Sequence, residues 1–257
     1  MERVDRPLVA SIGTTHPWNI AGVGLDAQVC AELHCAHAMA VVAVSAQDER
    51  GLHALHVVPP EIVRAQLEAL PPGVAAYRIG ALVSSETVRI VAQFVRERAS
   101  GIPVVVDPVI GVTLGGALQS DAALLQTLRD ELLALPVIVT PNAPEAAHLL
   151  GMPADSADAL QAAARAFVDR GAAAALVKGG HQEGDPADIL AVPDGEHRFE
   201  APRLPGSMRG SGCTLAAALA CELALGHELE AAVRSARDYV RAKISKRTMR
   251  GALQVAF

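Results

Sequence analysis

Several features that mark large classes of protein are missing from this sequence. Aromatic residues make up only 3% of its 257 residues, and its four cysteines form no CxxC pair. This spacing supports neither a disulfide framework nor a zinc site, so we expect reduced thiols, with Cys30 and Cys35 buried in a helix. No uncharged apolar run reaches the roughly 20 residues of a membrane span, and no apolar export segment lies near the start. These absences predict a cytoplasmic protein without membrane contact.

An excess of positive charge is also missing. The formal net charge is -6 and the pI is near 5.8, which argues against a nucleic-acid partner because phosphate backbones are bound by clustered Lys and Arg. Two nucleotide-binding signatures are absent as well, the G-x-x-x-x-G-K-[ST] loop and a G-x-G-x-x-G turn after the first strand. A P-loop kinase and a Rossmann dehydrogenase are therefore disfavoured.

What the sequence does contain is an alternation of strand-like and helix-like segments, with hydrophobic residues at 51% of the chain. Predicted strands lie in "PLVASIG", "MAVVAVSA", "AYRIGAL", "IPVVVDPVI", "PVIVTP" and "AALVKGG". Predicted helices cover 21–34, 60–70, 85–99, 120–133, 143–150, 156–170, 214–225 and 228–246.

This pattern predicts an α/β fold in three layers, α/β/α, with a central and mostly parallel sheet. Nearly continuous apolar strands are typical of parallel sheets that helices cover on both faces. Two polar stretches, 48–58 and 184–203, lack helical periodicity, and we interpret them as a projecting flap and an antiparallel edge hairpin. No linker or repeat divides the chain, so we expect a single domain over 1–257.

Unusual polar residues follow several of the predicted strands. Asp107 follows "VVV", Asn142 and Glu145 follow "VIVT", and Lys178 and Gly180 follow "ALV". Ligands of such sheets bind at the carboxyl ends of the strands, so we expect these side chains to meet there. An acid, an Asn-x-x-Glu pair and a lysine at one edge fit phosphoryl transfer, which needs a metal-bridged phosphate and a cationic partner.

The residues Gly210, Ser211, Gly212 and Cys213 form a turn directly before the predicted helix 214–225. Unpaired N–H groups and the positive end of a helix would cradle an anion there. Taken alone, Gly-Ser-Gly is equally explained by a tight turn that needs positive φ, and Lys178 by a solvated charge at a strand end. The occurrence of all these features at one sheet edge favours the phosphate interpretation.

Four motifs, in this order and with these separations, resemble the hydroxymethylpyrimidine/phosphomethylpyrimidine kinase branch of the ribokinase-like superfamily. They are "VVVDPVI", "VTPNAPEAAHLLG", "ALVKGGH" and "GSGCTLAAALA", and the stretch "VVAVSAQDERGLHALHVVPPEIVRAQLEAL" is similar as well. The resemblance covers nearly the whole chain. It implies a ribokinase-like fold and an ATP-dependent, Mg²⁺-dependent kinase of thiamine biosynthesis, which phosphorylates the hydroxymethyl group of the pyrimidine or its monophosphate.

The resemblance also implies roles for individual residues. Cys213 takes the position of the catalytic base, and we expect the helix N-terminus to lower the pKa of its thiol. The catalytic group would also include the anion hole, Gly210, Ser211 and Gly212, and Lys178, which would stabilise the transferring phosphoryl group. The nucleotide would be bound by Asn142, Lys178, Gly180 and Gly212. Asp107 and Glu145 would serve the metal. The acceptor would be bound by Gln47, Gly13, Asp26 and Gly80, with the Gln47 amide at the edge of the pyrimidine.

Departures from the family pattern concentrate on the side of the acceptor. The first loop of the family typically reads like "GSDxSGGAGIQAD", whereas here it reads "GTTHPWNIAGVGLD". Thr15 stands at the position of the family's acidic residue. Arg78 replaces the usual lysine before Gly80, and Arg209 stands before the glycine turn, as a phosphate partner or a plain surface charge. Two alternatives therefore stay open, a related kinase for pyridoxal or another small alcohol and a non-catalytic pyrimidine-binding protein. A homodimer is a further expectation that rests on the edge hairpin and the alanine-rich helices.

Overall fold

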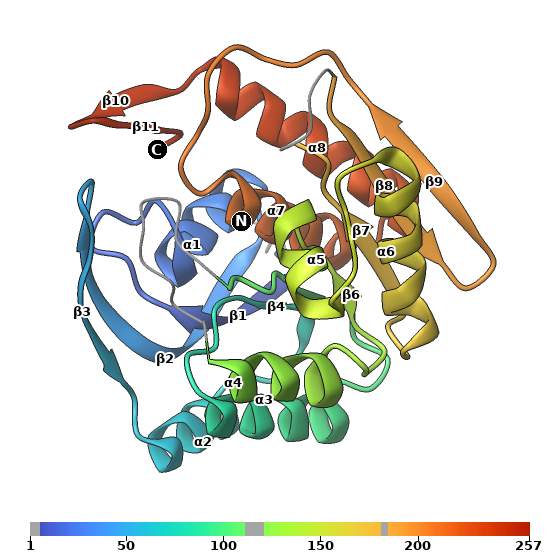
Figure 1. The fold of residues 1–257 in the computed structure, drawn as a ribbon. Helices are drawn as coiled ribbons and strands as arrows, with labels where there is room; N and C mark the ends of the chain where they lie inside the picture. The colour runs from blue at the N-terminus through green and yellow to red at the C-terminus, as the bar shows by residue number, and fades with distance from the viewer. Residues whose placement is uncertain (1–5, 111–120, 181–184) are drawn as a thin grey trace.

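One sheet of nine strands runs through the residues that the computed structural model describes, which are 6–110, 121–180 and 185–257 (Figure 1). The strands are β1 Leu8–Thr14, β2 Ala36–Asp48, β3 Gly51–Val57, β4 Val74–Ile79, β5 Val104–Val106, β6 Ile138–Val139, β7 Ala174–Val177, β8 Ala187–Val192 and β9 Gly195–Glu200. Their order is β3-β2-β1-β4-β5-β6-β7-β8-β9. Neighbours are parallel from β2 to β7, and β3, β8 and β9 pair antiparallel. The mostly parallel sheet, the flap (β3) and the edge hairpin (β8–β9) are thereby confirmed.

Helices cover both faces of this sheet. They are α1 Gly22–Glu32, α2 Pro60–Glu68, α3 Ser85–Arg98, α4 Ala122–Thr127, α5 Ala143–Leu150, α6 Ala157–Asp169, α7 Ser211–Ala224 and α8 Leu229–Ser245, and a π-helical turn Leu128–Leu132 continues α4. Helices α1, α7 and α8 share one apolar core, and α2 to α6 share the other. Strand residues alternate between the two cores, so that Val105 faces α7 while Val104 and Val106 face the opposite layer. The predicted three-layer architecture is confirmed.

The predicted helices differ from the structure mainly at their ends. The segment predicted as 120–133 begins at Ala122, with residue 120 outside the described residues, and its second half is the π-helical turn. Helix α7 begins at Ser211 instead of Thr214, because Gly210 takes a φ of 80° at the N-cap and lets the first turn start directly after it. Cys35 was expected within a helix, which is wrong, since it lies buried beyond the end of α1.

A C-terminal hairpin was not predicted from the sequence. It consists of β10 Thr248–Arg250 and β11 Leu253–Val255, each only three residues long. Leu253 and Val255 pack on Ile20 in the first loop, with Trp18 beside them. The hairpin is therefore stabilised by contacts with a distant segment of the chain, which its local sequence does not reveal. Among the described residues, no helix has the length and apolar character needed to span a membrane.

Candidate active site

A cavity of about 530 Å³ opens at the carboxyl ends of the parallel strands. Most of the predicted site residues line it, which are Gln47, Asp107, Asn142, Glu145, Lys178, Gly180, Gly210, Ser211, Gly212 and Cys213. Gly13, Asp26 and Gly80 are not among the lining residues. The strand ends and the start of α7 therefore form one site, as the sheet-edge argument predicts.

Three of the strand-end loops are joined by backbone hydrogen bonds that extend the sheet. The Lys178 N–H donates to Pro141 O at 2.9 Å, and the Asp107 N–H donates to Ile79 O at 2.9 Å. Asn142 and Lys178 form an isolated parallel bridge. Because the ladder continues past the strands, the side chains of Asp107, Asn142 and Lys178 are placed by rigid backbone.

Helix α7 starts at the glycine turn and points its first turn toward the cavity. Gly210 has a positive φ, and a Cβ there would collide with the carbonyl oxygen of Ile20, so this position requires glycine. The Thr214 hydroxyl donates back to Gly210 O at 2.9 Å and closes the turn. The N–H groups of the first helical turn have no acceptors within the helix, so this end has the donors that an anion would need.

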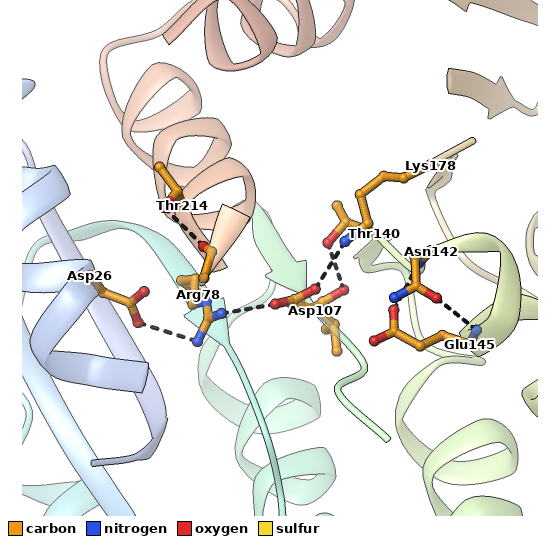
Figure 2. A network of polar contacts seen from close by, with 10 residues as sticks. Asp26, Arg78, Asp107, Thr140, Asn142, Glu145, Lys178 and Thr214 are labelled. Atoms are coloured by element: carbon orange, nitrogen blue, oxygen red, sulfur yellow. Dashed lines mark hydrogen bonds and ion pairs between the residues drawn. The ribbon is translucent and has the colours of Figure 1, made fainter. Parts of the chain in front are cut away.

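A chain of ion pairs crosses the floor of the site (Figure 2). The Arg78 guanidinium lies 3.3 Å from Asp26 Oδ2 and 3.1 Å from Asp107 Oδ2, and Lys178 Nζ lies 3.3 Å from Asp107 Oδ1. Arg78 and Asp26 are fully buried. A Cβ on Gly80 would overlap the guanidinium, so Gly80 provides the space in which Arg78 lies, and Gly13 packs against Gly80.

The chain of charges sets the protonation of its members. Burial raises the pKa of Asp26 to about 6, although Arg78 opposes this shift. Burial disfavours the charged form of Lys178, but Asp107 and Glu145 outweigh it, so the pKa of Lys178 is raised and the ammonium stays charged. The site therefore presents a fixed positive charge beside the glycine turn.

Cys213 differs from the expectation for a thiol at a helix N-terminus. Burial raises its pKa to about 11, while Arg78 and the Gly22 backbone N–H act in the opposite direction. The expected lowering of this pKa is wrong because desolvation of the thiolate exceeds the stabilisation by the helix end and the guanidinium. At neutral pH the group is a thiol.

Asn142 and Glu145 cap helix α5 and line the cavity at the same time. The Glu145 N–H donates to Asn142 Oδ1 at 2.9 Å, and the Asn142 N–H donates to Glu145 Oε2 at 2.7 Å. The structure is thus compatible with two roles for this pair, that of a helix cap and that of a site for a ligand. Burial raises the pKa of Glu145 to about 7, and Asp107 raises it further, with Lys178 opposing. No ion pair of Glu145 is found within the described part of the chain.

The cavity wall around Gln47, where the sequence predicts the acceptor, is built from segments far apart in the sequence. Gln47, near the end of β2, donates from Nε2 to Ser45 Oγ at 2.8 Å, and the Ser45 hydroxyl donates to Thr15 O at 2.5 Å. The Arg209 N–H donates to Gln254 O at 2.8 Å, and the Ala252 N–H donates to Glu49 Oε2 at 2.7 Å. The first loop, the β2–β3 turn, the segment before α7 and the C-terminal hairpin therefore meet at this wall.

Several lining residues received no assigned role from the sequence. Arg78 stood out only as a departure from the family lysine, and its burial between two carboxylates gives it a structural position at the centre of the site. His16 lines the cavity in the altered first loop, and Arg237 and Arg241 line its far end from α8. The available signal for Arg78 was an arginine within an otherwise apolar strand. Trp18 does not line the cavity.

A grouping of three or more His, Cys, Asp or Glu side chains able to hold a metal is absent from the described residues. Asp107 has both oxygens in ion pairs. Glu145, by contrast, is a buried carboxylate that faces the cavity. This donor set fits a Mg²⁺ ion that keeps most of its ligands as water and phosphate oxygens, which is how Mg²⁺ binds in many nucleotide sites.

The chain is similar to known proteins in both sequence and structure. The phosphomethylpyrimidine kinase family model matches residues 18–256. A hydroxymethylpyrimidine/phosphomethylpyrimidine kinase of Streptomyces coelicolor is 38% identical over 246 residues, covering 94% of this chain and 90% of the relative. The crystal structure of phosphomethylpyrimidine kinase from Clostridium difficile superposes with a TM-score of 0.82 at 25% identity, covering 93% of this chain and 100% of that one. Pyridoxal kinase from Staphylococcus aureus, solved in complex with ADP, has a TM-score of 0.87 at 26% identity, with 97% and 92% covered.

Proposed function

The chain belongs to the phosphomethylpyrimidine kinase family, and on this premise we propose that it transfers the γ-phosphoryl group of ATP to hydroxymethylpyrimidine, its monophosphate or both, in thiamine biosynthesis. Relatives at 34–38% identity carry this activity in their names, which supports the acceptor class. Nucleotide complexes of the structural relatives support ATP as the donor.

One observation carries this proposal. Lys178 Nζ lies beside the glycine turn, since a Cβ on Gly212 would be 3.2 Å from it, and the same nitrogen contacts Asp107. A phosphoryl group bound to the first-turn N–H groups of α7 would therefore also contact the partly buried ammonium of Lys178. Fixed donors and a fixed cation of this kind stabilise the charge that develops on a transferring phosphoryl group.

Mg²⁺ would be held by Glu145, with Asn142 and Asp107 binding its water ligands. When bound, the ion would neutralise negative charge on the nucleotide phosphates. Glu145 then serves as the carboxylate with no competing ion pair in the described residues, while Asp107 keeps Lys178 and Arg78 in place.

At the acceptor end, Gln47 would bind the edge of the pyrimidine, because its amide both donates and accepts hydrogen bonds. Its link to Ser45 fixes the orientation of the amide. For a hydroxymethyl acceptor, Cys213 would take the proton as the oxygen attacks, and Arg78 with the Gly22 N–H would stabilise the thiolate. A thiol with a pKa near 11 makes this a slow step at neutral pH.

ATP consumption by the purified protein tests the proposal. With Mg²⁺ present, hydroxymethylpyrimidine, its monophosphate, pyridoxal and a buffer blank are compared, and the products are identified by mass. We expect phosphorylated pyrimidine products and little turnover of pyridoxal. If neither pyrimidine is phosphorylated by a protein that still binds ATP, the proposal is contradicted. Turnover of pyridoxal alone would assign the chain to the alternative, a pyridoxal kinase.

A further inference from the structure

Two buried nitrogen atoms at the acceptor wall have no hydrogen-bond partner within residues 6–110, 121–180 and 185–257. They are His16 Nε2 and Arg209 Nη1, and both residues line the cavity. Buried donors without partners are rare in folded proteins because each loses its water without compensation. Such donors beside a cavity indicate a ligand that supplies the missing acceptors.

His16 is held as a donor toward that ligand. Its ring is 2% exposed, and its Nδ1 accepts a hydrogen bond from the Trp18 backbone N–H at 3.1 Å. An imidazole whose Nδ1 accepts must carry its proton on Nε2 when it is neutral. Burial, followed by the charge of Arg209, lowers the pKa of His16 to about 4, which keeps the ring neutral. Nε2 therefore offers one N–H group that has no acceptor among the described residues.

Arg209 adds a positive charge at the same wall. Its backbone N–H is fixed by the C-terminal hairpin through Gln254 O, and it directly precedes Gly210 of the glycine turn. Arg209 and His16 line the same cavity, and the charge of Arg209 contributes to the lowered pKa of His16. Burial lowers the pKa of Arg209, which means that the cation is incompletely solvated and would gain from a bound anion.

A guanidinium and a neutral N–H donor that line the same cavity as the glycine turn suit a phosphate group with free oxygens. The free hydroxymethyl alcohol offers one oxygen and no charge, so it leaves this pair of donors unsatisfied. A phosphate monoester offers an oxyanion already ionised near neutral pH, since its second pKa is about 6, and it needs no proton removed by Cys213 before it attacks.

We propose that Arg209 and His16 form a subsite for the phosphate of a phosphomonoester acceptor, which makes the pyrimidine monophosphate the preferred substrate over the free alcohol. This inference rests on the proposed function. In the transfer, an oxygen of the acceptor phosphate forms a bond to the γ-phosphorus of ATP while the bond to the bridging oxygen of ADP breaks. The products are a pyrimidine diphosphate ester and ADP.

Kinetics of variants with the two acceptors test the subsite. Arg209→Met removes the charge, Arg209→Lys keeps it, and His16→Gln keeps a donor that His16→Leu removes. The control is Arg64→Met, which removes an exposed arginine on α2 and is expected to change neither acceptor. The wild-type protein should show a higher kcat/KM for the monophosphate. We expect Arg209→Met and His16→Leu to lower the ratio of kcat/KM for monophosphate to that for alcohol by roughly tenfold to a hundredfold, with partial recovery in Arg209→Lys and His16→Gln.

The KM for ATP separates the two sources of phosphate. If Arg209 instead binds a phosphate of the nucleotide, Arg209→Met raises the KM for ATP with either acceptor and leaves the acceptor ratio unchanged, which overturns the inference. An unchanged ratio together with an unchanged KM for ATP overturns it too. If the wild-type protein turns over neither pyrimidine, the proposed function itself fails, and this outcome is distinct because it appears before any variant is made.

Discussion

The two halves of the cavity are built in different ways. On the phosphate side, Asp107, Asn142 and Lys178 stand at the ends of neighbouring parallel strands and are joined by sheet hydrogen bonds and ion pairs. The acceptor side is assembled from the first loop, β2, the segment before α7 and the C-terminal hairpin, and it keeps two buried donors without partners. We expect the preassembled half to serve the phosphoryl transfer and the assembled half to select the acceptor.

Arg78 joins the phosphate side and the acceptor side of the cavity. We therefore expect its replacement to have the largest effect on the protein. Arg78→Met leaves Asp26 and Asp107 as buried carboxylates without their shared cation, and we expect a loss of about 3–5 kcal/mol in the free energy of unfolding. Urea denaturation measures this value, with Arg78→Lys as the variant that keeps the charge. An Arg78→Met protein as stable as the wild type would show that the ion pairs contribute nothing to the fold.

Lys178→Met acts on the phosphate side alone. Because the ammonium lies against the glycine turn, we expect kcat to fall by roughly a hundredfold to a thousandfold for either acceptor. The matched control is Lys246→Met, an exposed lysine at the end of α8, which should keep full activity. A larger loss for one acceptor than for the other would contradict the division into two halves.

The pH dependence of turnover distinguishes the two acceptors. A base works only when deprotonated, and the pKa of Cys213 lies near 11, so below this pH the thiolate fraction increases with pH. Turnover of the hydroxymethyl acceptor should therefore rise about tenfold per pH unit between roughly pH 7 and 9. The monophosphate should give a flat profile over this range, because its second ionisation near pH 6 is already complete. Cys213→Ala should abolish the slope, and a flat wild-type profile with the alcohol would refute the base assignment.

We expect the smallest effect from replacing Asn142, and this variant distinguishes its role as a helix cap from its role in the site. Asn142 caps α5 and Ser156 caps α6, each by accepting a backbone N–H. Replacing either by Ala should cost about 1 kcal/mol of stability in thermal or chemical denaturation. Only Asn142→Ala should also raise the KM for ATP, since only Asn142 lines the cavity. Equal kinetics of the two variants would reduce Asn142 to a cap.

Much of the phosphate side was predictable because its signals are local. Each predicted residue follows an apolar strand, and parallel strands bring their carboxyl ends to one edge whatever the loops do. The glycine turn was also predictable, because glycine is the residue that favours positive φ. In the structure Gly210 has a φ of 80°. Gly13, Asp26 and Gly80 were expected at the acceptor, but they lie behind the cavity wall around Arg78, and their role in binding stays a prediction.

The sequence by itself determined the three-layer fold, the edge of the sheet that carries the site and the family, because apolar periodicity and strand-end motifs depend on neighbours along the chain. Only the tertiary structure decided the burial of Arg78 between two carboxylates, the raised pKa of Cys213 and the placement of His16 and Arg209 on one cavity. Desolvation and charge pairing depend on which distant segments enclose a group, and a C-terminal hairpin packed on the first loop is such an enclosure.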